Sequence, residues 1–321
     1  MTQLGLGTWA IGGPWTAGGA PAGWGQTDDG TSRAAIALAV EAGIRFFDTA
    51  QTYGTGHAES LLGEALAPHP EVRIATKVGY AIDPAARELV GPMTDPIAIA
   101  ASLEASRRRL RRDRIDLVLL HLNALPVAEA APVFDLLEGQ RAKGQVAAYG
   151  WSTDFPDRAT AFAGREGFTA VEHAMNVFFR ADALIPVIEG AGLQSLNRSP
   201  LAMGLLGGRI AQGHRFAPND VRRSGADWLA YFTHGEIAPD YARMLNAVRE
   251  LLTTGGRSLA QGAICWLWAR SAAAMPLPGF RTPDQVADLC GALAHGPLPA
   301  DTMAEIEAVI ARPPDGPPRE R

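Results

Sequence analysis

Short apolar runs alternate with amphipathic stretches along most of the chain. The runs are rich in β-branched and aromatic residues, as buried strands are, and span residues 4–9, 44–49, 73–77, 115–121, 146–151, 170–176, 193–198 and 273–277. The amphipathic stretches predict helices over residues 31–42, 96–111, 126–143, 157–165, 181–191, 240–253, 259–270 and 283–294. Strand alternating with helix indicates parallel strands joined by right-handed crossovers. Eight such units predict an α/β fold, a closed (β/α)8 TIM barrel, with a doubly wound open sheet as the alternative.

The same pattern indicates one domain, because neither an internal repeat nor a linker interrupts it. We expect the barrel to span residues 1–312. Residues 207–239 form a long stretch, rich in Gly, Arg and aromatic residues, between a strand and a helix. Loops of this length are often functional, so a lid is predicted there. Residues 313–321 are rich in proline and charge and predict a flexible tail.

Composition narrows the function classes. Hydrophobic residues make up 47% of the 321 residues and charged residues 20%, which is typical of a globular protein. A net charge of −5 argues against a nucleic-acid partner. Two cysteines exclude a disulfide framework, and no metal is expected. Without a signal peptide or a membrane-length apolar stretch, we expect a cytoplasmic protein, a monomer or weak homo-oligomer, with a small-molecule substrate and no membrane partner.

Lysine is scarce in this chain. Only Lys77 and Lys143 are lysines among the 29 basic residues, so arginine supplies the ordinary surface charge. Lys143 lies near the end of a predicted helix, where a cation suits the helix dipole. Lys77 ends an apolar run instead. A compact ammonium at such a position indicates a chemical role.

Four polar residues lie at the ends of three successive predicted strands: Asp48, Lys77 and His121 each end a run, and Tyr53 follows Asp48 by five residues. In a barrel, the carboxyl ends of the strands form the active face. A free phenol is a poor acid at neutral pH, and we expect a neighbouring ammonium to lower its pKa. A carboxylate would hold the ammonium, and the histidine would donate a hydrogen bond to a substrate oxygen. Each residue alone also suits a structural role, but together they predict a proton donor for hydride transfer to a carbonyl.

Several segments resemble the aldo-keto reductase family. They are residues 5–9 (GLGTW), 43–50 (GIRFFDTA), 53–54 (YG), 59–63 (ESLLG), 74–77 (IATK), 110–117 (LRRDRIDL), 120–121 (LH) and 199–206 (SPLAMGLL). The resemblance implies a (β/α)8 barrel and NADPH-dependent reduction of an aldehyde or ketone. It also implies that Tyr53 is the general acid, that Lys77 and Asp48 tune it, and that His121 orients the carbonyl.

The resemblance further implies a cofactor site. It places Gly7, Thr8, Trp9 and Asp48 near the nicotinamide, and Ser152 on its carboxamide. Around the phosphates and the adenosine it places Ser199, Pro200, Leu201, Gly204, Gly279, Arg281, Gln285 and Asp288. Arg281 is the expected partner of the 2′-phosphate, because a guanidinium binds phosphate oxygens in pairs.

Four features depart from the family pattern. Glu172 stands where the family usually has glutamine beside the carboxamide, and Arg198 stands where an aromatic ring often stacks on the nicotinamide. Leu289 replaces an asparagine that often contacts adenine. The hairpin that commonly closes the bottom of the barrel is expected to be absent. The three substitutions leave NADH open as an alternative to NADPH (NADP+).

The sequence specifies the substrate poorly. Trp15, Trp24 and Trp151 are candidate pocket residues beside Tyr53 and His121, and aromatic walls suit apolar and sugar faces alike. Three alternative functions stay open. One is an NAD(P)-dependent sugar or alcohol dehydrogenase on the same site, and another is a regulatory protein that binds NADP(H) with little turnover. The third is a phosphate-binding isomerase or lyase.

Overall fold

Eight parallel strands form a barrel. In the computed structural model, which describes residues 3–210, 213–226 and 228–313, the strand order is β1-β4-β5-β8-β9-β10-β11-β14. These strands are β1 (Leu6–Gly7), β4 (Phe46–Asp48), β5 (Arg73–Val78), β8 (Ile115–Leu120), β9 (Val146–Ser152), β10 (Phe168–Ala174), β11 (Gln194–Arg198) and β14 (Ala274–Pro276). Backbone hydrogen bonds from Gly5 N to Pro276 O (3.1 Å) and from Gly7 N to Pro278 O (3.0 Å) join the two ends of the sheet. The predicted TIM barrel is therefore confirmed, and the open sheet is excluded.

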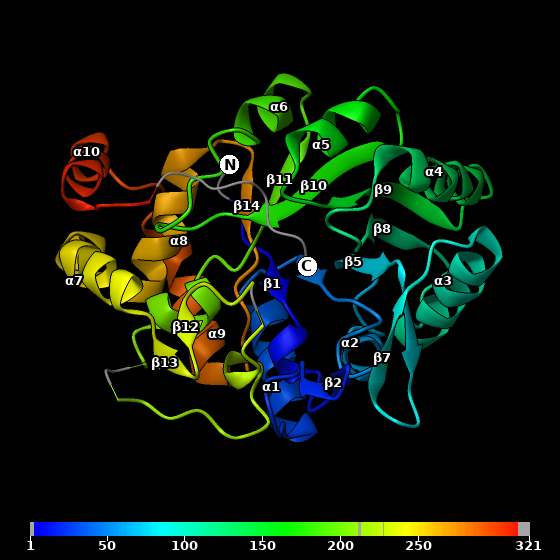
Figure 1. Cartoon of the computed structure of the whole chain (residues 1–321), viewed down its shortest axis with the longest axis horizontal. Helices are drawn as coiled ribbons and strands as arrows, with labels where there is room; N and C mark the ends of the chain where they lie inside the picture. Colours follow the sequence, from blue (N-terminus) through cyan, green and yellow to red (C-terminus); the bar gives the residue numbers. More distant parts are fainter. Residues whose placement is uncertain (1–2, 211–212, 227, 314–321) are drawn as a thin grey trace.

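Helices surround this barrel (Figure 1). They are α1 (Asp29–Glu41), α2 (His57–Ala65), α3 (Pro96–Leu110), α4 (Val127–Ala142), α5 (Pro156–Phe162), α6 (Ile185–Gly190), α7 (Pro239–Thr253), α8 (Leu259–Arg270), α9 (Pro283–Gly291) and α10 (Ala300–Val309). The sequence did not predict α2 or α10. In the described ranges, no helix combines the length and the apolar character that a membrane crossing needs.

Local sequence explains where α8 and α9 begin. Ser258 and Gln261 form a reciprocal capping box at the start of α8, and Thr282 and Gln285 do the same for α9. Pro283 occupies the first turn of α9, where its missing N–H costs nothing. The buried carboxylate of Glu59 fixes α2, since it accepts hydrogen bonds from Thr76 of β5 and Arg109 of α3.

The inside of the barrel is apolar in its lower half. Phe46, Leu117, Leu119, Leu196 and Met275 pack there from neighbouring strands. A separate and larger core lies between the outer face of the strands and the helices. Asp48, Lys77, Ser152 and Glu172 are buried polar side chains at the carboxyl ends of the strands, above this apolar half.

A small sheet adds a wall at this end. It has the order β3-β2-β7-β6, formed by β2 (Thr16–Ala17), β3 (Ala20–Pro21), β6 (Tyr80–Asp83) and β7 (Glu88–Pro92). The predicted lid at 207–239 contains a second short hairpin, β12 (Phe232–Thr233) and β13 (Glu236–Ile237). The predicted tail lies almost wholly outside the described residues.

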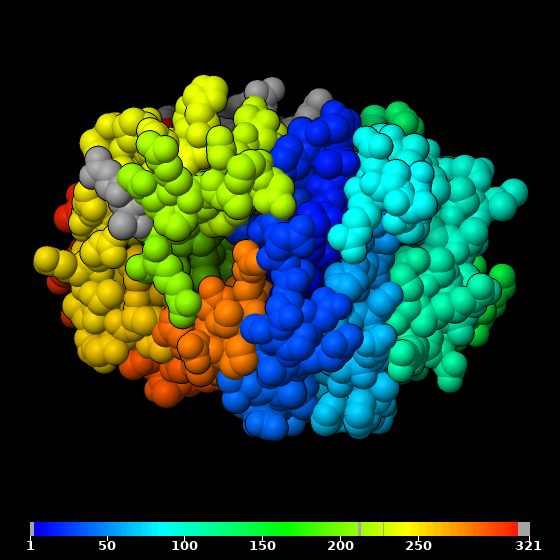
Figure 2. Space-filling view, turned by 90° about the horizontal axis from the view of Figure 1, so that it is seen from below, coloured from blue at the N-terminus to red at the C-terminus, as the bar shows by residue number. Residues whose placement is uncertain are grey.

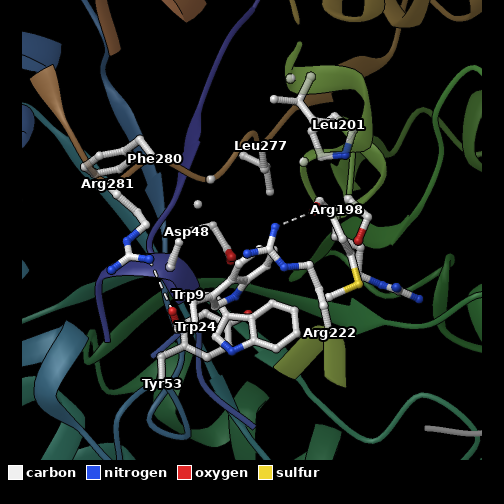
Figure 3. Close-up of a pocket in the computed structure, with 18 of the residues that line it drawn as sticks. Trp9, Trp24, Asp48, Tyr53, Arg198, Leu201, Arg222, Leu277, Phe280 and Arg281 are labelled. Carbon is white, nitrogen blue, oxygen red and sulfur yellow. Dashed lines mark hydrogen bonds between the residues drawn. The ribbon is translucent and has the colours of Figure 1, made fainter. Parts of the chain in front are cut away.

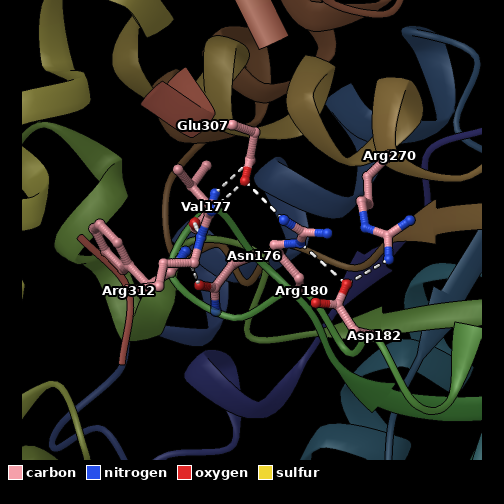
Figure 4. A network of polar contacts seen from close by, with 8 residues as sticks. Asn176, Val177, Arg180, Asp182, Arg270, Glu307 and Arg312 are labelled. Atoms are coloured by element: carbon pink, nitrogen blue, oxygen red, sulfur yellow. Dashed lines mark hydrogen bonds and ion pairs between the residues drawn. The ribbon is translucent and has the colours of Figure 1, made fainter. Parts of the chain in front are cut away.

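An ion-pair network attaches α10 to the barrel (Figure 4). The Glu307 carboxylate accepts hydrogen bonds from Arg180 Nη1 at 2.8 Å and from Arg312 Nη1 at 2.6 Å. Arg312 Nε also donates to Val177 O at 2.7 Å, and its guanidinium lies 5.7 Å from the centre of the Trp266 ring. Arg312 therefore links the end of α10 to the loop after β10.

Replacing Arg312 by alanine should lower the free energy of unfolding by about 1–2 kcal/mol, because several charge-assisted hydrogen bonds to a mostly buried side chain are lost. Urea unfolding measures this. The matched control is Arg243→Ala, which breaks a pair between side chains that are 73% and 72% exposed. Its expected cost is below about 0.5 kcal/mol. Equal costs for the two variants would contradict the role given to Arg312.

Candidate active site

Four predicted side chains meet at the carboxyl end of the barrel. Asp48 ends β4, Lys77 lies one residue before the end of β5, and His121 directly follows β8. Lys77 Nζ donates to both carboxylate oxygens of Asp48 at 2.6 Å and to Thr49 O at 3.1 Å. It also donates to the Tyr53 phenol oxygen at 3.3 Å. The rings of Tyr53 and His121 are edge to face, with centroids 6.1 Å apart.

A fifth residue joins this group. Glu172 of β10 places its Oε2 atom 3.2 Å from Lys77 Nζ, and both side chains are almost completely buried. This oxygen makes no hydrogen bond among the described residues. Two carboxylates, Asp48 and Glu172, therefore share one ammonium. From sequence, Glu172 was expected only beside the cofactor carboxamide, so its contact with Lys77 is a new feature.

Burial dominates the protonation of the site. Burial and, next, the neighbouring Glu172 carboxylate raise the pKa of Asp48, Lys77 lowers it, and the net result is a pKa of about 7. Burial also raises the pKa of Tyr53, and the lowering effect of Lys77 does not cancel it. Lys77 thus acts on the phenol pKa in the expected downward direction, but burial outweighs it and the net shift is upward. Tyr53 remains a protonated phenol near neutral pH.

His121 is neutral. Burial lowers the pKa of its imidazole well below the ordinary value, and the positive charges of Lys77 and Arg198 act in the same direction. A neutral imidazole has one N–H donor, which is what the hydrogen-bonding role needs. Its Nδ1 atom has no hydrogen-bond partner within the described part of the chain.

A cavity of about 550 Å³ extends from these residues. Figure 3 shows Asp48, Trp9 and Trp24 between Arg281 on one side and Leu201 with Arg198 on the other. The predicted residues that line it are Gly7, Trp9, Trp15, Trp24, Asp48, Tyr53, His121, Ser152, Glu172, Arg198, Ser199, Pro200, Leu201, Gly204, Gly279, Arg281, Gln285 and Asp288. Lining residues that the sequence did not single out include Tyr80, Asn123, Met203, Leu277 and Phe280.

Three predicted residues do not line the cavity: Lys77, which lies beneath Asp48 and Tyr53, and Trp151 and Thr8. The prediction for Trp151 is wrong: this ring is fully buried against Phe134 and Phe162, and its Nε1 donates to Leu122 O. Side chains alternate along a strand, and since Ser152 faces the cavity, Trp151 faces the helices. Thr8 is also fully buried, and its hydroxyl donates to the backbone oxygen of Asp48 at 3.0 Å. Thr8 therefore holds Asp48 in place.

A sequence model of the Aldo/keto reductase family matches residues 3–311, nearly the whole chain. The chain belongs to the aldo/keto reductase family. The resemblance noted in the sequence is thereby confirmed, and membership makes this chain an NAD(P)H-dependent oxidoreductase.

Individual relatives agree in fold and extent. The aldo-keto reductase YhdN of Bacillus subtilis (strain 168) is 28% identical over 89% of this chain and 83% of its own length. The NADH-specific methylglyoxal reductase of Escherichia coli (strain K12) is 26% identical over 97% and 96%. The solved glycerol dehydrogenase AKR11B4 from Gluconobacter oxydans superposes with a TM-score of 0.80 and 26% identity, covering 98% of this chain and 94% of that one.

In this aldo/keto reductase, Arg198 is fixed by an ion pair. One of its guanidinium nitrogens bonds to Asp154, and that carboxylate also accepts from the backbone N–H of Ala174 at 2.9 Å. Its Nη1 atom has no hydrogen-bond partner within the described ranges. Arg198 therefore reaches the cavity with its charge balanced and one donor available.

The segment after β11 has an unusual backbone. Ser199, Ala202 and Met203 all have positive φ angles (54°, 47° and 54°), a region that side chains with a Cβ rarely enter. Gly204 follows at φ 94°. Such strain persists where the surrounding structure holds it, often at ligand sites. Here it shapes the cavity wall around Leu201.

Described residues of the 207–239 segment, among them Arg222 and Trp228, line the cavity. Val221 N donates to Gly23 O at 2.8 Å, and the Arg222 guanidinium lies over the rings of Trp24 at 4.6 Å and Phe216 at 3.8 Å. In Figure 2 the yellow-green lid lies beside the blue N-terminal segment. Arg281 reaches the same N-terminal segment by donating to the carbonyls of Trp24 and Gln26.

Lys77→Met should cost roughly 3 kcal/mol of unfolding free energy near pH 7.5, because two buried carboxylates lose their counter-charge. The cost should shrink near pH 5, since uncompensated buried carboxylates protonate and become neutral. Urea unfolding at both pH values measures this. Lys143→Met, at the only other lysine, is the control and should change little at either pH. A cost for Lys77→Met that does not vary with pH would contradict this electrostatic account.

Proposed function

We propose that this aldo/keto reductase reduces an aldehyde or ketone to the alcohol with NADPH, and that Tyr53 supplies the proton. The single observation that carries the proposal is the buried Lys77 ammonium, which contacts both Asp48 and the Tyr53 phenol at the base of a long cavity. An unpaired phenol in an apolar pocket would have no such partner. The arrangement suits an oxygen that gains negative charge.

The residues present fit a dinucleotide cofactor. Near Tyr53, the cavity wall is formed by Ser152, Glu172 and Arg198, and the last two keep polar atoms without hydrogen bonds. Ser152 would hold the carboxamide, and the 199–204 segment would hold the phosphates. When bound, the nicotinamide supplies the hydride.

The remaining part of the cofactor site would be formed by Gly279, Arg281, Gln285 and Asp288. Arg281 forms no ion pair with a carboxylate of the described ranges, and it is only partly engaged by two backbone carbonyls. Its charge is thus available to the 2′-phosphate that distinguishes NADPH from NADH. Burial lowers the pKa of Arg281, the Asp220 carboxylate acts against it, and the Arg222 cation lowers it again; because the net shift is downward, an anion beside Arg281 would be stabilised.

Side chains of the protein would supply the proton that the substrate oxygen needs. Tyr53 stays protonated because burial raises its pKa, so it can donate to the substrate oxygen as negative charge develops there. The phenolate left behind is stabilised by Lys77 Nζ, 3.3 Å away. His121, neutral and facing the Tyr53 ring, would donate its N–H to the same substrate oxygen.

The substrate wall supports a carbonyl compound with an apolar or aromatic face. Trp15 and Trp24 line the cavity, and the Trp9 ring stacks on Tyr53 with centroids 6.0 Å apart. Tyr80 packs edge to face on His121 at 5.5 Å. We assign Trp15, Trp24, Tyr53 and His121 to substrate contact on this basis.

The reverse reaction, oxidation of an alcohol, is the second candidate. Two observations favour it: Glu172 adds a negative charge at the site, and a similar structure is a glycerol dehydrogenase. The same four residues serve either direction, because the forward and reverse reactions share one transition state.

Tyr53→Phe should leave NADPH binding within about twofold and lower turnover by about 10²- to 10⁴-fold, because only the proton donor is removed. Steady-state oxidation of NADPH with methylglyoxal and with benzaldehyde measures turnover, and protein fluorescence measures binding. Tyr149→Phe is the control, since that buried phenol bonds to Glu138 away from the cavity. Turnover that survives in Tyr53→Phe to within a few-fold would show that another group supplies the proton.

A further inference from the structure

Glu172 carries a negative charge that Lys77 does not satisfy. An ammonium has three N–H donors. Lys77 already shares these three hydrogens among four acceptor oxygens: the two of the Asp48 carboxylate, Thr49 O and the Tyr53 phenol. None remains for Glu172, which explains why its Oε2 atom is only 3.2 Å from Nζ yet makes no hydrogen bond.

Glu172 also faces the place where the proposed nicotinamide would lie. In the parallel register it is level with Ser152 on β9 and Leu196 on β11, and Ser152 and Glu172 both line the cavity. Its side chain is 2% exposed, so little water screens its charge. A buried carboxylate without a hydrogen bond acts strongly on any charge placed beside it.

Charged and titratable groups from several strands surround Glu172. The titratable and charged groups facing this centre are Asp48 on β4, Tyr53 after β4, Lys77 on β5, His121 after β8 and Arg198 on β11. Tyr53 and His121 are neutral, and Arg198 is balanced by Asp154. With both carboxylates ionised, Lys77 leaves one negative charge uncompensated. With one proton on the pair of Asp48 and Glu172, the centre is neutral.

We propose that Glu172 makes the site distinguish the two oxidation states of its cofactor: the ionised pair Asp48–Glu172 favours the cationic oxidised nicotinamide, and the singly protonated pair suits the neutral reduced one. The inference rests on the proposed function. It also assigns a preferred direction of reaction: at higher pH the site favours bound NADP+, and the enzyme therefore favours alcohol oxidation.

Alcohol oxidation releases one hydride and one proton, and the proposed site has an acceptor for each. In alcohol oxidation the substrate C–H bond would break and its hydride would go to the nicotinamide, while Tyr53 would take the O–H proton as its own phenol proton passes by way of Lys77 toward the carboxylate pair. Lys77 lies between Tyr53 and both carboxylates, at 3.3 Å from the phenol and 3.2 Å from Glu172. The pair, ionised while NADP+ is bound, can therefore take up the released proton. Burial raises the pKa of Asp48 to about 7, so this exchange falls near neutral pH.

The test is the ratio of dissociation constants, Kd for NADPH over Kd for NADP+, followed by protein fluorescence from about pH 6 to about pH 8. Both ligands carry the same 2′-phosphate, so its titration cancels in the ratio. For the wild type the ratio should rise about tenfold over this range, because NADP+ binding releases a proton from the pair. Calorimetry in two buffers of different ionisation enthalpy should show that release for NADP+ and not for NADPH.

Glu172→Gln keeps the shape and removes the charge, so its ratio should stay flat and calorimetry should detect no proton release. Glu172→Asp should restore a slope. Glu250→Gln, the same change at an exposed position of α7, should behave like the wild type. If the wild-type ratio does not change with pH, or if it changes equally in Glu172→Gln, the inference is overturned. The proposed function would still stand in that case, because the protein binds the cofactor. If wild-type protein binds neither NADPH nor NADP+, the proposed function fails and the inference with it.

Discussion

The buried ammonium of Lys77 is the interaction on which the site depends. A fully buried positive charge is tolerated only with partners that compensate its lost hydration, and Asp48, Thr49 and Tyr53 supply them. Three separate segments, β4, the loop after it and β5, are fixed relative to one another by these bonds. The ammonium thus holds the catalytic geometry and sets the local electrostatics at the same time.

Closure of the barrel brings the other groups to this centre. Glu172 and Ser152 lie on strands far from β5 in the sequence, and only the closed sheet places them on the same cavity. The lid and Arg281 then cover the cavity from the other side by bonding to the segment around Trp24. Burial is the largest cause of the pKa shifts at Asp48, Tyr53 and His121.

Sequence could predict the barrel because each strand is a short apolar run with its own signal. It could not predict the sheet around β2, because Thr16 pairs with Glu88, and no local pattern records such a distant partner. The alternation along β9 should have placed Trp151 outside, given Ser152 inside. The shift of the Tyr53 pKa depends on burial and on two carboxylates, which only the folded structure brings together. The four catalytic candidates were found because each lies at, or within a few residues of, the carboxyl end of a strand.

We propose that the cavity holds a nicotinamide dinucleotide against Tyr53 and Lys77, with Arg281 available for its 2′-phosphate. Titrating the protein with NADPH and with NADH, while following its tryptophan fluorescence, tests this most directly, since Trp9 and Trp24 line the cavity. The account predicts saturable binding of both, with NADPH binding at least about tenfold more tightly because of one buried charge-assisted contact. If the protein bound neither NADPH nor NADH, this proposal would be contradicted.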